Sequence, residues 1–374
     1  MAKVKLGEVA KEYKATVKDA ADLPVVGLEH LIPGQVELTQ WSEDADNTFT
    51  KGFKKGQMLF GRRRAYLKKA ALAPFDGICS GDITVIEAIP ERIMPELLPF
   101  VIQNDSLFDY AVEKSAGSLS PRVKWEHLKN YEFELPEMEH QRALVDLLWA
   151  MTITKKAYQE LVKKTDELVK SQFIELFGDP ETNTMNWEHM TLSSIVTNSN
   201  NGITRRGNDV DGQIVLRIAE LQDGYIDYSD VNRIVTKDKE QKCLLVNRDL
   251  LFVRVNGNPD YVARSAIFED IGEAVYHNDH IIRMHIDEKR ASVIYVRGFI
   301  TSDYGRKQLK DNVKTSAGQY SISQDGIGGI QIYLPPLEEQ ERYVKLVRQS
   351  DKSKFELAQA ISRIDDMIKA LMQG

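Results

Sequence analysis

Two stretches of the chain place apolar residues at steps of three or four, with polar residues between them. No Pro or Gly interrupts either stretch, from Arg142 to Phe177 and from Glu341 to Gln373. This spacing predicts one long helix in each, ~35 residues or ~50 Å long. The stripes are Leu144, Leu148, Met151, Tyr158, Val162, Thr165, Val169 and Leu176 in the first, and Val344, Val347, Phe355, Ala358, Ile361, Ile364, Ile368 and Leu371 in the second.

A helix of that length has more apolar stripe than one small domain can cover. We therefore expect the two helices to pair as a coiled coil, the alternative being two ordinary core helices. Leu-Pro precedes each helix, and glutamates in the first turns suit the positive end of the helix dipole. Gly178-Asp179-Pro180 ends the first helix with a Gly stop and a Pro that cannot continue it.

The remaining sequence consists of short β-prone runs broken by Gly, Asn, Asp and Pro, which is typical of compact, mostly β domains. Helical segments are expected within it around 95–114 and around 289–312. The pattern predicts an α+β fold of two mixed α/β domains, each followed by a long helix. Its parts are a first domain (1–135), a spacer helix and linker (136–182), a second domain (183–335) and a C-terminal spacer helix (336–374).

The two halves match each other at nearly constant offsets, which indicates a diverged internal repeat. Leu135 to Arg142 matches Leu334 to Glu341 at an offset of 199. Ser115-Ala116-Gly117 matches Ser316-Ala317-Gly318 at 201, Met58 to Arg62 matches Leu250 to Arg254 at 192, and Leu28 to Gly34 matches Ile218 to Gly224 at 190. The alternative is that these short apolar segments match by chance.

Composition excludes several classes of protein. The chain has 374 residues, 42% of them apolar, and a net charge of −7, which is ordinary for a globular protein. Two cysteines, Cys79 and Cys243, form no disulfide framework and indicate a reducing, cytoplasmic location. No apolar run is long enough for a membrane span, and no signal peptide follows Met1.

Catalytic motifs are missing from the sequence. Asn258-Pro259-Asp260-Tyr261 lacks the second Pro of an adenine methyltransferase loop and is expected to be a turn. There is no phosphate-binding Gly-x4-Gly-Lys-Ser/Thr loop. The seven histidines show no ligand spacing, so surface or hydrogen-bonding roles are favoured over a metal site. The sequence predicts no catalysis by this chain.

Binding chemistry is present instead. Lys51 to Lys69 holds eight cations and no acid, and guanidinium groups bind phosphate or guanine edges. A solvated strand face is the alternative. The second repeat offers Arg and Asn in the matching stretch, and two loops rich in Ser, Thr and Gly suit phosphate contacts. The candidate DNA-binding residues are Arg62, Arg63, Arg64, Tyr66, Lys68, Lys69, Ser118, Arg122, Arg205, Arg206, Arg217, Arg254, Asn256, Asn258, Arg264, Gln319 and Tyr320.

These motifs resemble the specificity subunits of type I DNA restriction–modification systems, over essentially the whole chain. The most specific element is a Ser-Ala-Gly loop followed by a strand, Leu-Pro-x-Leu/Met-x-x-Gln and a long helix. It runs from Ser115 to Gln141 and again from Ser316 to Gln340. Trp187 to Ile195 resembles the family's Trp-x4-Leu-x2-Ile opening, whereas Lys5 to Val9 in the first half lacks the Trp.

The resemblance implies two target recognition domains, each reading half of a bipartite sequence in double-stranded DNA. The helices would pair antiparallel, space the domains and dock two modification subunits, which bind S-adenosylmethionine. Two restriction subunits would add ATP- and Mg-dependent translocation and cleavage. The specificity subunit itself is non-catalytic and holds no cofactor or metal. Candidate partner-binding residues on the helices are Gln141, Leu148, Tyr158, Gln340, Val347 and Ile361.

Two alternatives stay open at this point: a coiled-coil scaffold that does not read DNA, and a fused nuclease–methyltransferase. The negative charge does not exclude DNA, because residues 1–135 and 183–335 each have 18 basic and 20 acidic side chains. Contacts depend on where charge lies, and the first domain concentrates its cations in one stretch. Near-neutral domains predict weak non-specific DNA binding by the chain alone.

Overall fold

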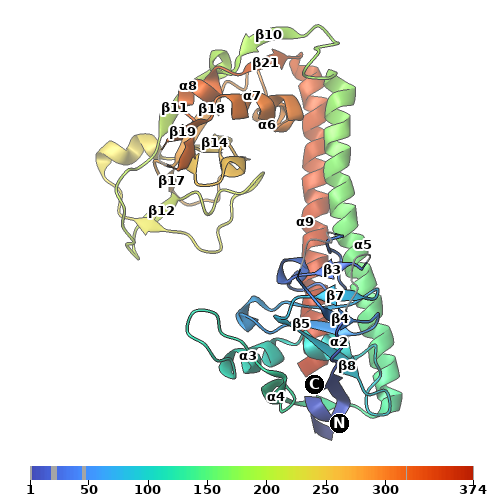
Figure 1. Cartoon of the computed structure of the whole chain (residues 1–374). Helices are drawn as coiled ribbons and strands as arrows, with labels where there is room; N and C mark the ends of the chain where they lie inside the picture. Colours follow the sequence, from blue (N-terminus) through green and yellow to red (C-terminus); the bar gives the residue numbers. More distant parts are fainter. Residues whose placement is uncertain (1, 18–22, 44–47, 317, 374) are drawn as a thin grey trace. The chain divides into compact units, whose positions relative to one another are not determined.

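The computed structural model describes residues 2–17, 23–43, 48–316 and 318–373. It divides into two compact units, Met1–Leu161 with Leu357–Gly374, and Val162–Glu356. Each unit contains one mixed segment together with parts of both long helices (Figure 1). The predicted fold class is confirmed, since each mixed segment is followed by a long helix.

Each unit is built on a four-stranded antiparallel sheet with the same strand order. In the first unit the order is β2 (Ala10–Glu12), β8 (Ile83–Ala88), β5 (Met58–Gly61) and β6 (Ala70–Leu72). In the second it is β11 (Val196–Asn201), β18 (Ile281–Ile286), β14 (Leu250–Val253) and β16 (Ser265–Ile267). The matching apolar runs of the sequence are the equivalent strands β5 and β14, both fully buried. This equivalence confirms the internal repeat.

A smaller sheet in each unit contains a parallel pair with an antiparallel third strand. The first unit joins β3 (Val25–Val26), β7 (Gly77–Cys79) and β4 (Lys51–Phe53). The second joins β17 (Val275–His277), β12 (Gln213–Leu216) and β13 (Arg233–Ile234). The third strand pairs with β7 in one unit but with β12 in the other. Isolated bridges fill the complementary positions, Val25 with Ser42 and Leu244 with Tyr276.

The first and last strands of each mixed segment pair with each other. β1 (Ala2–Lys5) is antiparallel to β9 (Glu132–Leu135), and β10 (Glu188–Thr191) to β21 (Gln331–Leu334). Each segment therefore begins and ends at one place, directly before its long helix. Trp187 secures the second segment there, because its indole nitrogen donates to the carbonyl of Phe177, 2.9 Å away.

The two expected helical regions each form a pair of short helices. Asn104 separates α2 (Leu98–Ile102) from α3 (Asp105–Glu113), and its side-chain oxygen caps α3 by accepting from Ser106 N. Ser302 caps α7 (Asp303–Asp311) after α6 (Val293–Thr301) in the same way. The other short helices are α1 (Leu6–Val9), α4 (Trp125–Leu128), α8 (Gln324–Gly328), η1 (Leu28–His30), η2 (Ala65–Leu67), η3 (Leu192–Ile195), η4 (Asp238–Cys243) and η5 (Pro259–Tyr261).

The long helices are α5 (Met138–Phe177) and α9 (Leu337–Gln373). Gly178 ends α5 as predicted, with φ of +78° and its N–H bonded to the carbonyl of Ile174. Within the described residues, neither these helices nor any other is both long and apolar enough to cross a membrane.

The two long helices run antiparallel. In the first unit, Leu148 of α5 shares a core with Ile368 and Leu371 near the end of α9. In the second unit, Phe173 and Phe177 at the end of α5 contact the ring of Tyr343 near the start of α9, at 5.3 and 5.7 Å between centroids. The predicted pairing of the two helices is thus confirmed.

Candidate nucleic-acid interface

The basic stretch of the first repeat is partly used by the fold itself. The ammonium groups of Lys51 and Lys69 donate to the carbonyls of Ile83 and Leu28, at 2.8 and 2.6 Å. Lys68 pairs with Asp105 at 2.6 Å. Lys68 and Lys69 therefore offer less free charge than the sequence indicates. The strongly exposed candidates in this stretch are Arg64 and Tyr66.

The Ser-rich loop folds back onto this basic stretch, so two separately predicted segments form one surface. Arg64 N donates to Pro121 O at 2.8 Å, and Val123 N donates to Arg62 O at 3.0 Å. Arg63 Nε donates to Ser120 Oγ, 57 residues along the chain, at 2.5 Å. Ser118 lies exposed in this loop. We call Arg62–Tyr66 and Ser115–Arg122 the first surface.

A single carboxylate organises the arginines of the first surface. Arg122 donates to Asp82 through Nε (2.7 Å) and Nη2 (3.1 Å), and Arg63 Nη1 lies 3.6 Å from the same carboxylate. The hydrogen bonds from Arg122 hold the pKa of Asp82 below its usual value. A charged Asp82 therefore faces two half-exposed guanidinium groups.

In the second repeat, regular β-strands form the equivalent pairing between the loop and the backbone that follows the central strand. β15 (Val255–Asn256) follows β14 and pairs with β20 (Gln319–Ser321), which pairs with β19 (Lys314–Ser316). Ile322 N donates to Arg254 O at 2.9 Å, as Val123 N does to Arg62 O. Arg254 thus occupies the position of Arg62. Ala317 of the Ser-Ala-Gly motif lies outside the described residues.

We call residues 254–258 together with β19 and β20 the second surface. A pocket of about 420 Å³ opens on it. Arg254 lines the pocket, and its Nε donates to Asp279 O at 2.7 Å. The other lining residues are Asn201, Lys314, Ser321, Ile322, Ser323, Gln324 and Asp325. Of the predicted residues beside the pocket, Gln319 is exposed and Tyr320 is half-buried.

The turn after β15 orients three further candidates. Asn256 Oδ1 accepts from Asn258 N at 2.9 Å, and Asn258 Oδ1 accepts from Asp260 N at 3.0 Å. Residues 258–261 are a turn, as predicted, and end in the 3-10 helix η5. The Arg264 guanidinium lies over the ring of Tyr261 at 3.6 Å, a cation–π contact that fixes its plane.

The remaining three arginines separate into two kinds. Arg205 donates to Glu240 at 2.8 and 2.9 Å, and Arg217 donates to buried Glu220 at 2.9 Å. Each neutralises a buried carboxylate, which gives both arginines a structural role. Their side chains remain 30% and 40% exposed, so their DNA contact stays a prediction. Arg206 is 58% exposed and pairs with Asp279 at 2.9 Å, which connects it to the neighbourhood of Arg254.

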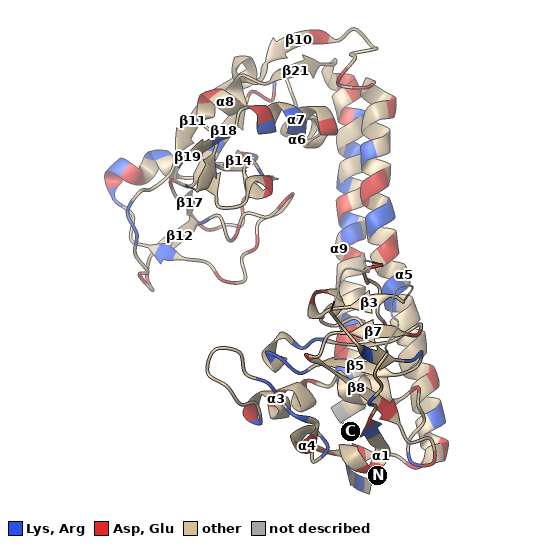
Figure 2. Cartoon of the chain, in the orientation of Figure 1, with Lys and Arg blue, Asp and Glu red and all other residues tan. Residues whose placement is uncertain are grey.

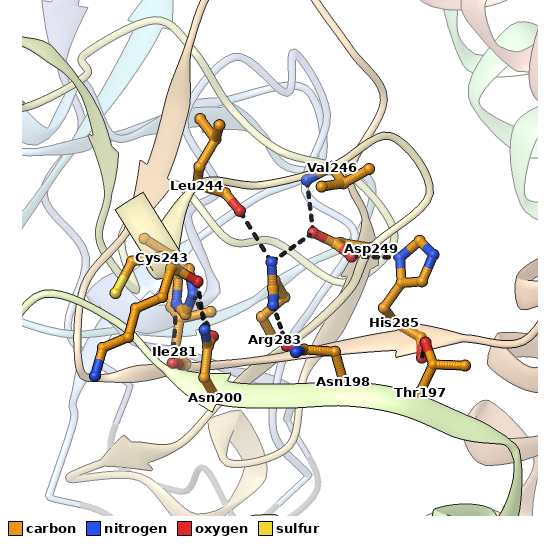
Figure 3. A network of polar contacts seen from close by, with 12 residues as sticks. Thr197, Asn198, Asn200, Cys243, Leu244, Val246, Asp249, Ile281, Arg283 and His285 are labelled. Carbon is orange, nitrogen blue, oxygen red and sulfur yellow. Dashed lines mark hydrogen bonds and ion pairs between the residues drawn. The ribbon is translucent and has the colours of Figure 1, made fainter. Parts of the chain in front are cut away.

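The sequence did not reveal a buried polar network in the second unit (Figure 3). Asp249 is fully buried, with Oδ1 2.8 Å from His285 Nδ1 and Oδ2 3.7 Å from Arg283 Nη1. Burial raises the pKa of Asp249, and it lowers the pKa of nearby His277 to about 4. Two features of the sequence could have indicated it. Asp249 directly precedes the apolar run of β14, and Arg283 lies within the apolar run of β18.

The residues that could have indicated other chemistry are used for packing. Cys79 and Cys243 are buried, and burial raises the pKa of Cys79 to about 12, so it is no nucleophile at neutral pH. His277 is buried and hydrogen-bonded, as expected of a non-ligand histidine. Over the part of the chain that is described, no three His, Cys, Asp or Glu side chains form a metal-holding group.

The predicted partner-binding residues do not share one environment. Gln141, Gln340 and Leu148 are at most 1% exposed within the chain, so they cannot contact a partner directly, and that prediction is corrected. Tyr158, Val347 and Ile361 are half-buried. Strongly exposed apolar side chains lie elsewhere on the helices: Leu147, Ile153, Leu168, Ile174, Phe355 and Met367. Basic and acidic residues are interspersed along both long helices (Figure 2).

Comparison with known proteins finds relatives of this chain among the specificity subunits of type I restriction enzymes. The specificity subunit of the type I restriction enzyme StySPI from Salmonella potsdam is 29% identical over 195 residues, covering 50% of this chain and 42% of the relative. The EcoKI specificity subunit of Escherichia coli K12 is 24% identical over 280 residues, covering 68% and 60%. The chain spans about half the length of the curated relatives it matches. No family model matches it.

Solved structures agree in fold. The type I restriction–modification S subunit of M. genitalium superposes with a TM-score of 0.57 at 14% identity, over 100% of this chain and 96% of the other. A chain from a structure describing complex assembly and conformational transition of the type I R-M system gives 0.56 at 18% identity, over 99% and 96%. The resemblance predicted from the sequence is thus confirmed: this chain is similar, in sequence and in fold, to the specificity subunits of type I restriction–modification systems.

Proposed function

We propose that this chain is the DNA-reading specificity subunit of a type I restriction–modification complex. Each repeat contacts one half of a bipartite target in double-stranded DNA. The observation that carries the proposal is the repeated surface: in both units a loop rich in Ser and Gly pairs with the backbone that follows the central strand. Arg62 and Arg254 stand at its equivalent positions. The specificity subunits among its relatives support the same function.

The chemistry of the two surfaces suits DNA. Guanidinium groups bind phosphates or guanine edges, and a side-chain amide pairs with adenine N6 and N7. Serine hydroxyls and exposed backbone N–H groups suit phosphate oxygens and fix the register of the protein on the duplex. The first surface supplies arginines and serines, whereas the second supplies Arg254, Asn256 and Asn258. Two different residue sets predict two different half-sites.

In this proposal the long helices connect the readers to catalytic partners. Two modification subunits dock on exposed apolar positions such as Ile153, Leu168 and Phe355. They bind S-adenosylmethionine and methylate adenine, and two restriction subunits use ATP and Mg²⁺. This chain positions the complex on DNA in the cytoplasm and does not catalyse a reaction.

Methylation mapping tests the proposal directly. Long-read sequencing compares cells that carry this chain and its modification partner with cells that carry the partner alone. We expect a methylated, bipartite motif that depends on the chain. If the complex assembles on the chain but the methylome is the same with and without it, the chain is a scaffold and the proposal fails. Methyl transfer by the pure chain alone would instead make it an enzyme.

A further inference from the structure

The contact between Asp82 and Arg122 fixes a guanidinium group in one orientation at the first surface. Asp82 binds the edge formed by Nε and Nη2, at 2.7 and 3.1 Å. The opposite amino group, Nη1, makes only a long 3.4 Å contact with Ser120 O. The end formed by Nη1 and Nη2 is therefore the free end of a side chain that is 41% exposed.

We propose that Arg122, held by Asp82, reads a guanine in the half-site of the first repeat. Two parallel donors at the end of a guanidinium group match guanine O6 and N7. Asp82 is then a positioning residue, which touches the arginine and not the base. The inference rests on the proposed DNA-reading function and deepens it by naming the base and the side chain.

The carboxylate makes the free end of Arg122 a weaker phosphate site than an unpaired arginine would be. Any phosphate bound at the free end of Arg122 would lie within a few ångströms of the charged Asp82, and like charges at that distance repel. The guanine edge is neutral and meets no such repulsion. Arg63 Nη1 lies 3.6 Å from Asp82 as well, so two cations share one anion, and the salt dependence of binding is needed to separate a base contact from a phosphate contact.

A role limited to stability is a weaker explanation of the same contact. Arg122 and Arg63 are 41% and 39% exposed at their side chains. Ion pairs that face solvent add little to stability, because water and salt screen them. The backbone bonds of Arg64 with Pro121 and of Val123 with Arg62 already hold the loop in place.

The second repeat lacks this pair. Arg62 N donates to Asp82 O, and the equivalent Arg254 N donates to His280 O, so His280 stands at the position of Asp82. Val123 and Ile322 are equivalent by the same reasoning, which places Ser321 at the position of Arg122. Loss of the pair should therefore alter one half-site only.

The experiment uses the full chain in complex with its modification subunits and a library of DNA targets. Arg122→Ala should relax one G·C position of one half-site, with about 10-fold or more loss of affinity for the wild-type target. Because no phosphate contact is lost, the slope of log K against log salt should stay unchanged; loss of a phosphate contact lowers it by about one. Asp82→Asn should relax the same position and raise affinity for non-specific DNA, and Asp82→Glu should stay closer to wild type.

Lys3→Ala is the matched control, because it removes an exposed ion pair with Glu132 (2.8 Å) outside the surface and should change neither motif nor slope. Arg122→Lys serves if Arg122→Ala does not fold. The inference is overturned if the folded variant keeps every motif position, relaxes an A·T position, or only lowers the salt slope. A wild-type complex without any bipartite preference would instead reject the proposed function.

Discussion

At the scale of single residues, the environment of each arginine decides its role more than its position in the sequence does. Arg205 and Arg217 bind glutamates that are at most 7% exposed, so part of their charge is neutralised inside the domain. Arg254 donates its Nε to a backbone carbonyl and lines an open pocket. A guanidinium group held by a neutral partner keeps its full charge for a ligand.

The first prediction concerns Arg254. Arg254→Ala should weaken binding to the wild-type target by about 1–3 kcal/mol, the typical value of a good bidentate base contact, and relax one half-site only. Target libraries with one half-site randomised at a time measure this. Arg233→Ala is the control, since Arg233 pairs with Glu273 on the small sheet of the same unit and should leave both half-sites unchanged. Equal loss at both half-sites would contradict the prediction.

The second prediction concerns His277, which is fully buried and has its pKa lowered to about 4 by burial. In the unfolded chain this histidine takes up a proton below about pH 6.5. In the folded chain it takes up the proton only below about pH 4. The free energy of unfolding should therefore fall by about 1.4 kcal/mol per pH unit as pH drops through this window.

Urea unfolding at several pH values measures this dependence. His277→Gln should lose that part of the slope, whereas His189→Gln, at an exposed histidine of the same unit, should keep it. Comparison between variants is needed because the raised pKa of Asp249 acts in the opposite direction: its folded form binds the proton first. An unchanged slope in His277→Gln would contradict the assignment.

At the scale of elements, one buried glutamine joins each long helix to its own domain. Gln141 accepts from Met94 N at 2.8 Å and donates to Pro136 O at 2.9 Å. Gln340 repeats this with Ser292 N and Pro335 O, at 2.8 and 2.7 Å. The glutamine of the Leu-Pro-x-Leu/Met-x-x-Gln motif is thus a structural amide that fixes where the helix leaves the domain.

The third prediction follows from this arrangement. Gln141→Leu should lower the free energy of unfolding by about 2–4 kcal/mol, because a buried N–H and a buried carbonyl lose their partner. Denaturant titration checks the value. Gln159→Ala changes an exposed residue of the same helix and should stay within about 0.5 kcal/mol of wild type. A similarly small effect of Gln141→Leu would mean that water replaces the amide.

The elements that were predictable are those that local sequence determines. Apolar steps of three or four located both long helices to within a few residues, and a Gly stop located the end of α5. The contacts that make the sites were not predictable, because Arg63 with Ser120 and Asp249 with His285 join residues far apart in the chain. Their partners depend on strand register, and apolar runs alone do not specify it. Gln141 was misassigned since burial of a polar helix residue leaves no periodic signal.

At the scale of the whole molecule, the repeat accounts for the proposed reading of two different half-sites by one chain. The two central sheets share strand order, and the equivalent loops follow equivalent strands. Side chains at equivalent loop positions differ, such as Asp82 and His280. In the proposed function, a common scaffold with exchanged loop residues would give two specificities, and the long helices would act as the spacer.

The last prediction tests that division of roles. Lys155 pairs with Asp365, and Lys354 pairs with Asp166. Moving from position 155 to 166 on α5 therefore corresponds to moving from position 365 back to 354 on α9. Four helical residues inserted after Lys156 and four after Arg363 keep the helices matched and lengthen each by about 6 Å. We expect the methylated motif to keep both half-sites and to gain about two unread base pairs, at about 3.4 Å per base pair. Gln159→Ala without insertion should keep the original spacer. If the insertion changed a half-site, the helices would take part in base reading and the spacer role would be wrong.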